Sequence, residues 1–372
     1  MKVLILHNVL WAHYKSVLFE AMYVHKPSSM ELKVVHIAKN DISRKGMEDT
    51  GFAYQYPYEV LFDNYIELVP TYKKVWAVCR YIYAYKPDII NIGGWGVDLS
   101  ITFSVVFSYI LGIKMVISNE STVHDRNNRG IKEYFKKKLM GMTKAFIVFG
   151  KSSKDYLKNY GITDAQFLEE NAAVVDDKAI KAKFAEFSTS DYLPEIKTSH
   201  NFVFVGRIVA VKNLDLLLNA FEVVKAQIPD WGLIVVGNGD KEQLLNQLTK
   251  NQETRIYHYA AVDWREVPKF YSKSDCIVLP SFSEAWGLVI NEAMLCGLAV
   301  ITSDRCGCAE DLVKDVGIIF ESGNQKELEK ALLQVASNTD LLSQMKQKSS
   351  EKIENYKAEE VAKRIVNGFL KL

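Results

Sequence analysis

The chain has 372 residues, of which 48% are hydrophobic and 24% charged, a globular composition with room for two domains of ordinary size. Its formal net charge of +1 excludes a broadly basic protein of the kind that binds nucleic acid. The five cysteines are scattered, which favours reduced thiols in a cytoplasmic protein over a disulfide framework. The isolated pair Cys306-x-Cys308 lacks further ligands at metal-site spacing, so we expect no zinc site.

The chain begins with a short apolar run that is not followed by a small-residue cleavage site, so Val3–Leu6 predicts a buried strand rather than a signal peptide. The most hydrophobic segment, Leu99–Val116, is interrupted by serines, a glycine and a lysine and falls short of a membrane span. We expect it to form a buried helix, a turn at Gly112 and the strand Met115–Ser118.

Short, apolar, β-branched segments alternate with helical segments along the whole chain, which is typical of parallel strands covered on both faces. The predicted strands of the first half are Val3–Leu6, Val34–Ile37, Ile89–Ile92, Met115–Ser118 and Phe146–Phe149. Those of the second half are Phe202–Val205, Leu233–Val236, Ile256–His258, Cys276–Leu279, Ala299–Thr302 and Gly317–Phe320. This rhythm predicts two doubly wound α/β domains, with ligands at the carboxyl ends of the strands.

The apolar rhythm lapses between Asn171 and Asp191, where charged and small residues take over. We therefore expect an N-terminal domain at residues 1–175 and a C-terminal domain at residues 176–355. Residues 356–372 contain a last amphipathic stretch. This stretch is either an ordinary terminal helix or one that crosses back to the first domain.

Two cations follow the predicted strand Phe202–Val205. Gly206 frees the backbone at the turn, Arg207 offers a planar fork that fits phosphate oxygens, and Lys212 adds a mobile point charge. The alternative is a pair of surface cations beside a helix start. The next strand is followed by Gly237-Asn238-Gly239, which is either half of a dinucleotide fingerprint or a plain tight turn.

A loop with Glu284 leads through Gly287 into a predicted helix that carries Glu292 and ends at Gly297. The backbone amides of Trp286, Gly287, Leu288 and Val289 would face an anion at the positive end of this helix. Carboxylates accept hydrogen bonds from sugar hydroxyls, so a sugar–diphosphate–ribose ligand fits the pattern. The alternative is a solvated loop glutamate and a second one that satisfies the helix dipole.

Together these features resemble the retaining glycosyltransferases of the GT-B fold, specifically glycosyltransferase family 4, the glycosyl transferases group 1. The resemblance is strong over Asn201–Val316 and implies two Rossmann-like domains facing a cleft. The residues that carry it are Gly206, Arg207 and Lys212; Pro280, Ser281 and Glu284; and Glu292, Ala293 and Gly297.

The resemblance implies a role for each of these positions. Arg207 and Lys212 would hold the diphosphate of a nucleotide sugar and stabilise the charge that grows on it. Glu292 would bind the ribose hydroxyls and Glu284 would face the donor sugar. Gly206, Gly287, Leu288 and Val289 would complete the phosphate site, and Trp286 would form a wall of the sugar pocket. No metal is expected, and the anomeric configuration would be retained.

The first domain departs from the family pattern. The loop after its first strand has no glycine, so Asn8, His13 and Lys15 either contact the acceptor or belong to a plain βα loop. Family members often place a histidine at a strand end that faces the donor sugar. That position selects Glu120 here, with His124 four residues later, and either residue could take the role.

Two stretches of the first domain, Tyr72–Lys86 and Lys132–Lys138, are basic and aromatic. They are either solvated helix faces or a docking surface for an anionic membrane.

We therefore expect a cytoplasmic enzyme that is either free in the cytoplasm or peripheral on the inner face of the plasma membrane. It would move a hexose-type sugar from a UDP- or GDP-linked donor to a glycan or lipid-linked acceptor, in surface polysaccharide or glycolipid synthesis. The alternatives are a GT-B sugar-nucleotide epimerase, a phosphorylase and a non-catalytic nucleotide-sugar-binding protein.

Overall fold

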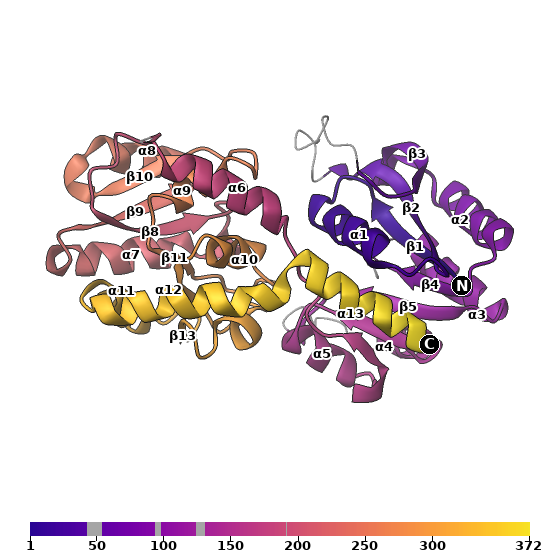
Figure 1. Ribbon diagram of the computed structural model, residues 1–372. Coiled ribbons are helices and arrows are strands. Elements are labelled where there is room, and N and C mark those ends of the chain that lie inside the picture. The colour runs from indigo at the N-terminus through magenta and orange to yellow at the C-terminus, as the bar shows by residue number, and fades with distance from the viewer. Residues whose placement is uncertain (43–53, 94–97, 124–130, 191) are drawn as a thin grey trace. The chain divides into compact units, whose positions relative to one another are not determined.

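The computed structural model describes residues 1–42, 54–93, 98–123, 131–190 and 192–372 (Figure 1). The chain divides into two units. The first comprises Met1–Val174 together with Lys357–Leu372, and the second comprises Val175–Tyr356. Among the described residues, no helix has both the length and the apolar character needed to cross a membrane.

The first unit is built on a parallel sheet with strand order β3-β2-β1-β4-β5-β6-β7. Its strands are β1 (Lys2–Val9), β2 (Glu31–Asn40), β3 (Tyr58–Tyr65), β4 (Ile89–Ile92), β5 (Lys114–Asn119), β6 (Ala145–Val148) and β7 (Phe167–Glu169). Its helices are α1 (His13–His25), α2 (Thr71–Tyr85), α3 (Leu99–Ile110), α4 (Ile131–Gly141), α5 (Lys151–Lys158) and α13 (Ala358–Lys371).

Right-handed crossovers determine which face of this sheet each helix covers. α1 leads from β1 to β2, whereas α2, α3 and α4 connect strands that advance in the opposite direction, so these three helices share the other face. The packing agrees, because α2 contacts α3, α3 contacts α4, and α1 contacts α13 (Figure 1). The terminal helix α13 buries Val361, Ile365 and Phe369, and Arg364 Nε lies 2.6 Å from Glu169 Oε2 of β7.

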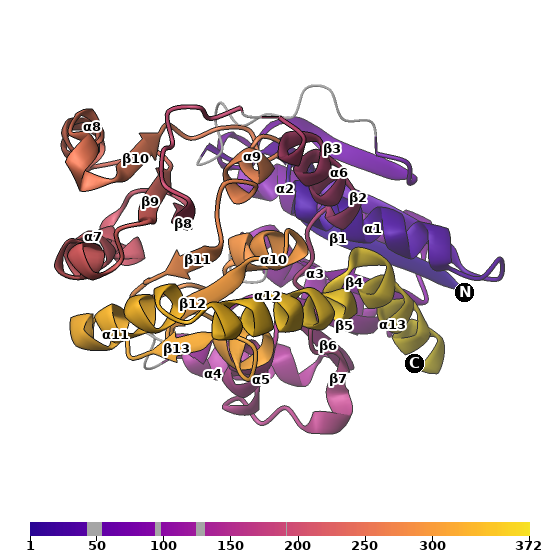
Figure 2. The same cartoon turned by 60° about the vertical axis from the view of Figure 1, so that its left-hand side comes forward.

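The second unit contains a parallel sheet with strand order β10-β9-β8-β11-β12-β13. Its strands are β8 (His200–Val205), β9 (Trp231–Val236), β10 (Ile256–Tyr259), β11 (Cys276–Leu279), β12 (Ala299–Ser303) and β13 (Ile318–Phe320). Its helices are α6 (Asp177–Ser188), α7 (Leu214–Val224), α8 (Glu242–Lys250), α9 (Val267–Tyr271), α10 (Leu288–Leu295), α11 (Gln325–Ala336) and α12 (Thr339–Ile353). Helix α12 packs over β12 and α11 over β13 (Figure 2).

The predicted architecture of two doubly wound α/β domains is confirmed. Each predicted strand is present, and β4 and β11 have the predicted bounds. The sequence did not indicate β3 or β7, because β3 is an edge strand without buried residues whose apolar run is confined to Val60, Leu61 and Phe62, and β7 has three residues. The helix expected to be buried, α3, instead exposes Phe103 and Ile110.

Strand order determines where each sheet can hold a ligand. In the second unit the chain lays β9 and β10 on one side of β8 and then returns to build β11, β12 and β13 on its other side. The loops that follow β8 and β11 therefore diverge at a topological switch point, where open α/β sheets bind ligands beyond their carboxyl ends. In the first unit the equivalent point lies between β1 and β4.

Candidate functional site

The loop after β8 rests on the Gly237-Asn238-Gly239 turn that follows β9. The Gly206 amide donates to the Val236 carbonyl at 3.0 Å, and the Ile208 amide donates to the Asn238 carbonyl at 2.8 Å. A Cβ at residue 237 would lie 3.0 Å from the Gly206 carbonyl carbon and overlap its oxygen. The two glycines of this turn therefore permit close backbone approach, which supports the loop that carries Arg207 and makes the turn part of the scaffold.

The loops after β8 and β11 are joined by a backbone bond and an ion pair. The Phe282 amide donates to the Val211 carbonyl at 2.8 Å. Next to this hydrogen bond along the chain, Lys212 Nζ contacts Glu284 Oε2, and the two side chains are 17% and 18% exposed. The structure thus brings together two predicted site residues that lie 72 positions apart in the sequence.

Two influences act on the charge of Lys212. Burial lowers its pKa, and the nearby guanidinium of Arg207 acts in the same direction. The carboxylate of Glu284 in direct contact favours the ammonium form, since an opposite charge at this range stabilises the charged state. We take Lys212 to be an ammonium at neutral pH because this contact is direct. Arg207 and Lys212 therefore place two positive charges beside the single carboxylate of Glu284.

The Glu284 loop is held from its other side by the segment after β12. The Glu284 amide donates to the Arg305 carbonyl at 3.2 Å, and the Gly307 amide donates back to the Glu284 carbonyl at 2.9 Å. A Cβ at residue 307 would lie 2.7 Å from the Ala285 carbonyl carbon and overlap its oxygen. This close backbone contact fixes the position of the Glu284 loop relative to the segment that follows β12.

Helix α10 begins at this loop. Gly287, with φ of +101°, is its N-cap residue, a left-handed conformation that glycine adopts without strain. The amides of Leu288 and Val289 belong to the first turn, where a helix supplies no acceptor of its own, so they can bind an anion. Because Gly287 directly follows the Glu284 loop, these amides belong to the same switch point as Lys212.

The side chain of Trp286 is predicted as a wall of a sugar pocket, and the structure corrects this prediction. The indole is 2% exposed, and its Nε1 donates to Asn291 Oδ1 at 2.8 Å. Its ring centroid lies 6.3 Å from that of Tyr356. The ring is a core residue beneath α10, because its hydrogen-bonding and packing partners both lie inside the unit.

Glu292 lies in the second turn of α10, and Tyr271 Oη of α9 donates to its Oε2 at 3.1 Å. The same hydroxyl lies 3.4 Å from the Val289 carbonyl, which places the Glu292 carboxyl next to the start of α10. Burial raises the pKa of Glu292 to about 7, and the Tyr271 hydrogen bond opposes this rise. A carboxyl in this state accepts hydrogen bonds from hydroxyls and, when protonated, also donates one.

The raised pKa predicts a pH-dependent effect of Glu292→Gln on stability. The unfolded carboxyl ionises near its ordinary pKa of 4.5, while the folded one holds its proton to about 7, so folding is progressively disfavoured as the pH rises between these values. At about pH 8 the variant should be more stable than the parent, by at most about 3 kcal/mol, and the gain should shrink towards pH 5. Urea unfolding at both pH values measures it.

The matched control is Glu310→Gln, because Glu310 is an exposed carboxylate of the same unit paired with Lys314. A gain for Glu292→Gln that is equal at both pH values would contradict the raised pKa.

Two buried polar groups near the switch point had no predicted ligand role. Among the residues that the structure describes, Asn213 Nδ2 and Ser281 Oγ have no hydrogen-bond partner. Asn213 follows Lys212 directly and begins α7 with φ of 52°, which asparagine tolerates better than most residues. Ser281 belongs to the motif that carries the family resemblance, but a sequence gives no signal that its hydroxyl stays unpaired.

In the first unit, Glu120 and Lys15 form a second cluster. Lys15 Nζ lies 2.6 Å from Glu120 Oε1, and Tyr14 Oη donates to Glu120 Oε2 at 3.4 Å. The Lys15 ammonium lies 4.2 Å from the centroid of the Phe149 ring. Glu120, predicted to face the donor, and Lys15, predicted to contact the acceptor, therefore form one ion pair at the carboxyl ends of the strands.

The remaining predicted residues of the first unit are Asn8, His13 and His124. Asn8 is buried within β1, and the ring of His13 stacks on Tyr54 with centroids 6.2 Å apart. His124 lies outside the described residues, as do residues 125–130.

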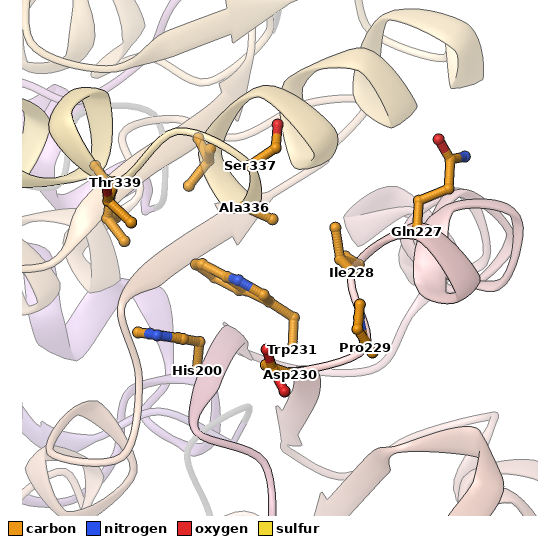
Figure 3. Close-up of a pocket in the computed structure, with 11 residues that line it drawn as sticks. His200, Gln227, Ile228, Pro229, Asp230, Trp231, Ala336, Ser337 and Thr339 are labelled. Carbon is orange, nitrogen blue, oxygen red and sulfur yellow. The ribbon is translucent and has the colours of Figure 1, made fainter.

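A cavity of about 300 Å³ lies at the amino ends of the strands of the second sheet, at the opposite end of the strands from the switch point (Figure 3). Its walls come from the first residues of β8 and β9, His200 and Trp231, and from the end of α11 near Ser337. His200 stacks on Trp231 with centroids 5.2 Å apart, and its Nδ1 lies 3.0 Å from Asp275 Oδ2. None of the predicted site residues lines this cavity.

Residues 190–352 match the family described as Glycosyl transferases group 1. Most of the second unit is therefore similar to the domain that defines this family. All the predicted donor-site residues, from Gly206 to Glu292, lie within the matched residues of this domain.

Individual relatives match only part of the chain. An uncharacterized glycosyltransferase of Haemophilus influenzae is 31% identical over 159 residues, which cover 42% of this chain and 45% of that protein. The GDP-mannose-dependent monoacylated alpha-(1-6)-phosphatidylinositol monomannoside mannosyltransferase of Corynebacterium glutamicum is 25% identical over 137 residues, or 35% of this chain and 36% of that protein. The chain thus matches less than half the length of these two curated relatives.

The whole fold has solved counterparts. HepE of Anabaena, whose crystal structure was determined in complex with UDP, superimposes with a TM-score of 0.75 over 100% of both chains at 17% identity. Similarity at this identity establishes that both units of the chain share the fold of HepE.

Proposed function

We propose that the protein is a retaining, metal-independent glycosyltransferase that moves a hexose-type sugar from a nucleoside diphosphate donor to a glycan or lipid-linked acceptor. The observation that carries the proposal is the switch point of the second unit. There Arg207, Lys212 and the amides of Leu288 and Val289 supply positive charge and hydrogen-bond donors for a diphosphate.

Donor binding would rearrange the ion pair between Lys212 and Glu284. Diphosphate oxygens would compete for the Lys212 ammonium, because phosphate carries more charge than a carboxylate. Glu284, released from Lys212, would then accept hydrogen bonds from hydroxyls of the donor sugar. Glu292, beside the Val289 carbonyl, would accept hydrogen bonds from the ribose.

In the chemical step, the bond between the anomeric carbon and the diphosphate oxygen breaks. The acceptor hydroxyl forms its bond to the same face of that carbon, and its proton passes to the departing diphosphate. Negative charge grows on the diphosphate as the bond breaks, so the Arg207 and Lys212 cations stabilise the transition state more than the bound donor. We assign no carboxylate nucleophile.

Nucleotide and acceptor classes are supported by similar proteins. HepE was crystallised with UDP, and the Corynebacterium relative is described as using GDP-mannose and a phosphatidylinositol mannoside. We therefore propose a UDP- or GDP-linked donor, and an acceptor from surface polysaccharide or glycolipid synthesis at the inner face of the membrane.

Calorimetric titration with matched mono- and diphosphates tests this function. UDP or GDP should bind at least about tenfold more tightly than UMP or GMP, since the second phosphate adds a charge-assisted contact. Failure of both diphosphates to bind would refute the donor site. Once a donor is found, NMR of the product should show the donor's anomeric configuration, and turnover should persist in EDTA.

A further inference from the structure

Helix α3 contains no charged residue, and it exposes several large apolar side chains to solvent. Leu99 is 60% exposed, Phe103 52% and Ile110 72%, and Tyr109 is exposed beside them. The opposite side of the helix is buried in the unit through Ser100, Ile101, Ser104, Val105 and Ser108. Half of α3 is thus core and half is an apolar surface without a described partner in the chain.

Helix α2 packs beside α3 and continues this surface. Its side chains Tyr72, Trp76 and Tyr83 are each more than 60% exposed. Between them lie exposed cations, of which Arg80 stands 5.0 Å above the Trp76 ring. Residues 71–86 contain Lys73, Lys74, Arg80 and Lys86 and no acidic residue.

Helix α4, which packs on the other side of α3, adds the same combination. Tyr134 and Phe135 are each about 60% exposed and are followed by the exposed Lys137 and Lys138, whereas Lys136 contacts the Tyr156 hydroxyl. We call the exposed side chains of these three helices the α2–α4 face. Its apolar and aromatic members are Tyr72, Trp76, Tyr83, Leu99, Phe103, Tyr109, Ile110, Leu111, Tyr134 and Phe135.

The second unit shows what an ordinary surface of this protein looks like. Its exposed large apolar residues stand singly on different elements, such as Val223 on α7 and Leu244 on α8. Soluble proteins rarely gather so many exposed apolar side chains on one layer without an interaction partner. The α2–α4 face therefore differs in kind from the rest of the described surface.

The charge of the α2–α4 face selects the partner. Asp98, next to α3, is paired with the buried Lys74. The half-buried Glu133 of α4 is outnumbered by Lys137 and Lys138, so the exposed cations prevail. A second copy of the chain that met this face through a two-fold axis would bring lysines opposite lysines, which is unfavourable. An anionic phospholipid surface offers both complements, because phosphates attract the cations and the interface accommodates aromatic and aliphatic side chains.

We propose that the α2–α4 face docks on an anionic phospholipid bilayer. The apolar side of α3 enters the headgroup boundary, and Lys73, Arg80, Lys137 and Lys138 lie among the phosphates. The docking surface stands on the geometry of the first unit alone. Its consequence, that the acceptor is presented from the bilayer, rests on the proposed glycosyltransferase function.

Vesicle co-sedimentation of the full chain tests the proposal. The chain should bind vesicles that contain phosphatidylglycerol more tightly than pure phosphatidylcholine vesicles, and binding should fall as salt is raised. Phe103→Asp with Ile110→Asp should lower binding more than about tenfold, because two apolar side chains leave the interface. The matched control Val223→Asp, at an exposed helical position of the second unit, should bind as the parent does.

Two pairs of charge-reversal substitutions distinguish electrostatic attraction to the lipid phosphates from the insertion of apolar side chains. Lys73→Glu with Arg80→Glu should weaken binding at least about tenfold, whereas Lys326→Glu with Lys330→Glu, on exposed α11 positions, should change it little. Equal losses for both pairs would mean that only net charge acts and would overturn the proposed face. Absence of binding to phosphatidylglycerol vesicles at low salt would also overturn it.

Two further readouts distinguish the remaining outcomes. If sedimentation shows a dimer that Phe103→Asp with Ile110→Asp abolishes, the face binds a second copy and the lipid proposal is wrong. UDP and GDP titrations should be unchanged in these surface variants, since the donor loops lie in the other unit. Loss of vesicle binding with intact nucleotide binding thus separates this proposal from the proposed function.

Discussion

Lys212→Ala is expected to lower kcat by about 10²–10³-fold while the fold persists. The lysine ammonium would contact the diphosphate, on which charge grows only as the glycosidic bond breaks, so its loss raises the barrier of the chemical step. The measurement is donor turnover at saturating donor, compared with the parent protein.

Two companion variants make this result interpretable. Lys346→Ala removes a lysine of the same unit that pairs with Asp275 at 3.0 Å, at the amino end of β11 and opposite the end that carries Glu284, and should leave turnover unchanged. Lys212→Ala leaves the partly buried Glu284 without its cation, so the double variant with Glu284→Gln reports whether any instability comes from that carboxylate. Turnover of Lys212→Ala within about fivefold of the parent would exclude the leaving-group role.

Gly307→Ala is expected to destabilise the protein by about 2–4 kcal/mol and to weaken UDP or GDP binding more than tenfold. The added methyl group would overlap the Ala285 carbonyl, so the Glu284 loop must move away from the segment after β12. That movement displaces Glu284 and the first turn of α10 together. Urea unfolding and nucleotide titration measure the two effects.

The control for this variant is Gly141→Ala, because nothing lies within 4 Å of a Cβ built at that glycine. It should be neutral or slightly stabilising, since alanine restricts the unfolded chain more than glycine does. Unchanged stability and nucleotide affinity in Gly307→Ala would show that the Glu284 loop tolerates displacement and does not need its support.

Local patterns predicted the strands that are buried on both faces, because a short run of mostly apolar residues gives the same signal wherever it occurs. β4 and β11 illustrate this. The strand β3 escaped prediction because an edge strand needs no apolar run on its exposed side. Its identity as a strand depends on pairing with β2, which is a tertiary contact.

The parts of the site that depend on distant contacts could not be predicted. The composition of the loops indicated phosphate-binding residues, but the ion pair between Lys212 and Glu284 arises only when the loops after β8 and β11 meet. The burial of Trp286 against Tyr356 likewise depends on a residue far along the chain. The exposure of α3 was missed because hydropathy cannot say whether both sides of an apolar helix are covered.

The central claim is that the diphosphate of a nucleotide sugar binds where the loops after β8 and β11 meet. A crystal structure of the protein with UDP or GDP tests it most directly. The account predicts phosphate oxygens within hydrogen-bond distance of Lys212 Nζ and of the Leu288 or Val289 amide, with Glu292 at the ribose. A diphosphate bound away from these groups, for example in the cavity beside His200 and Trp231, would contradict it.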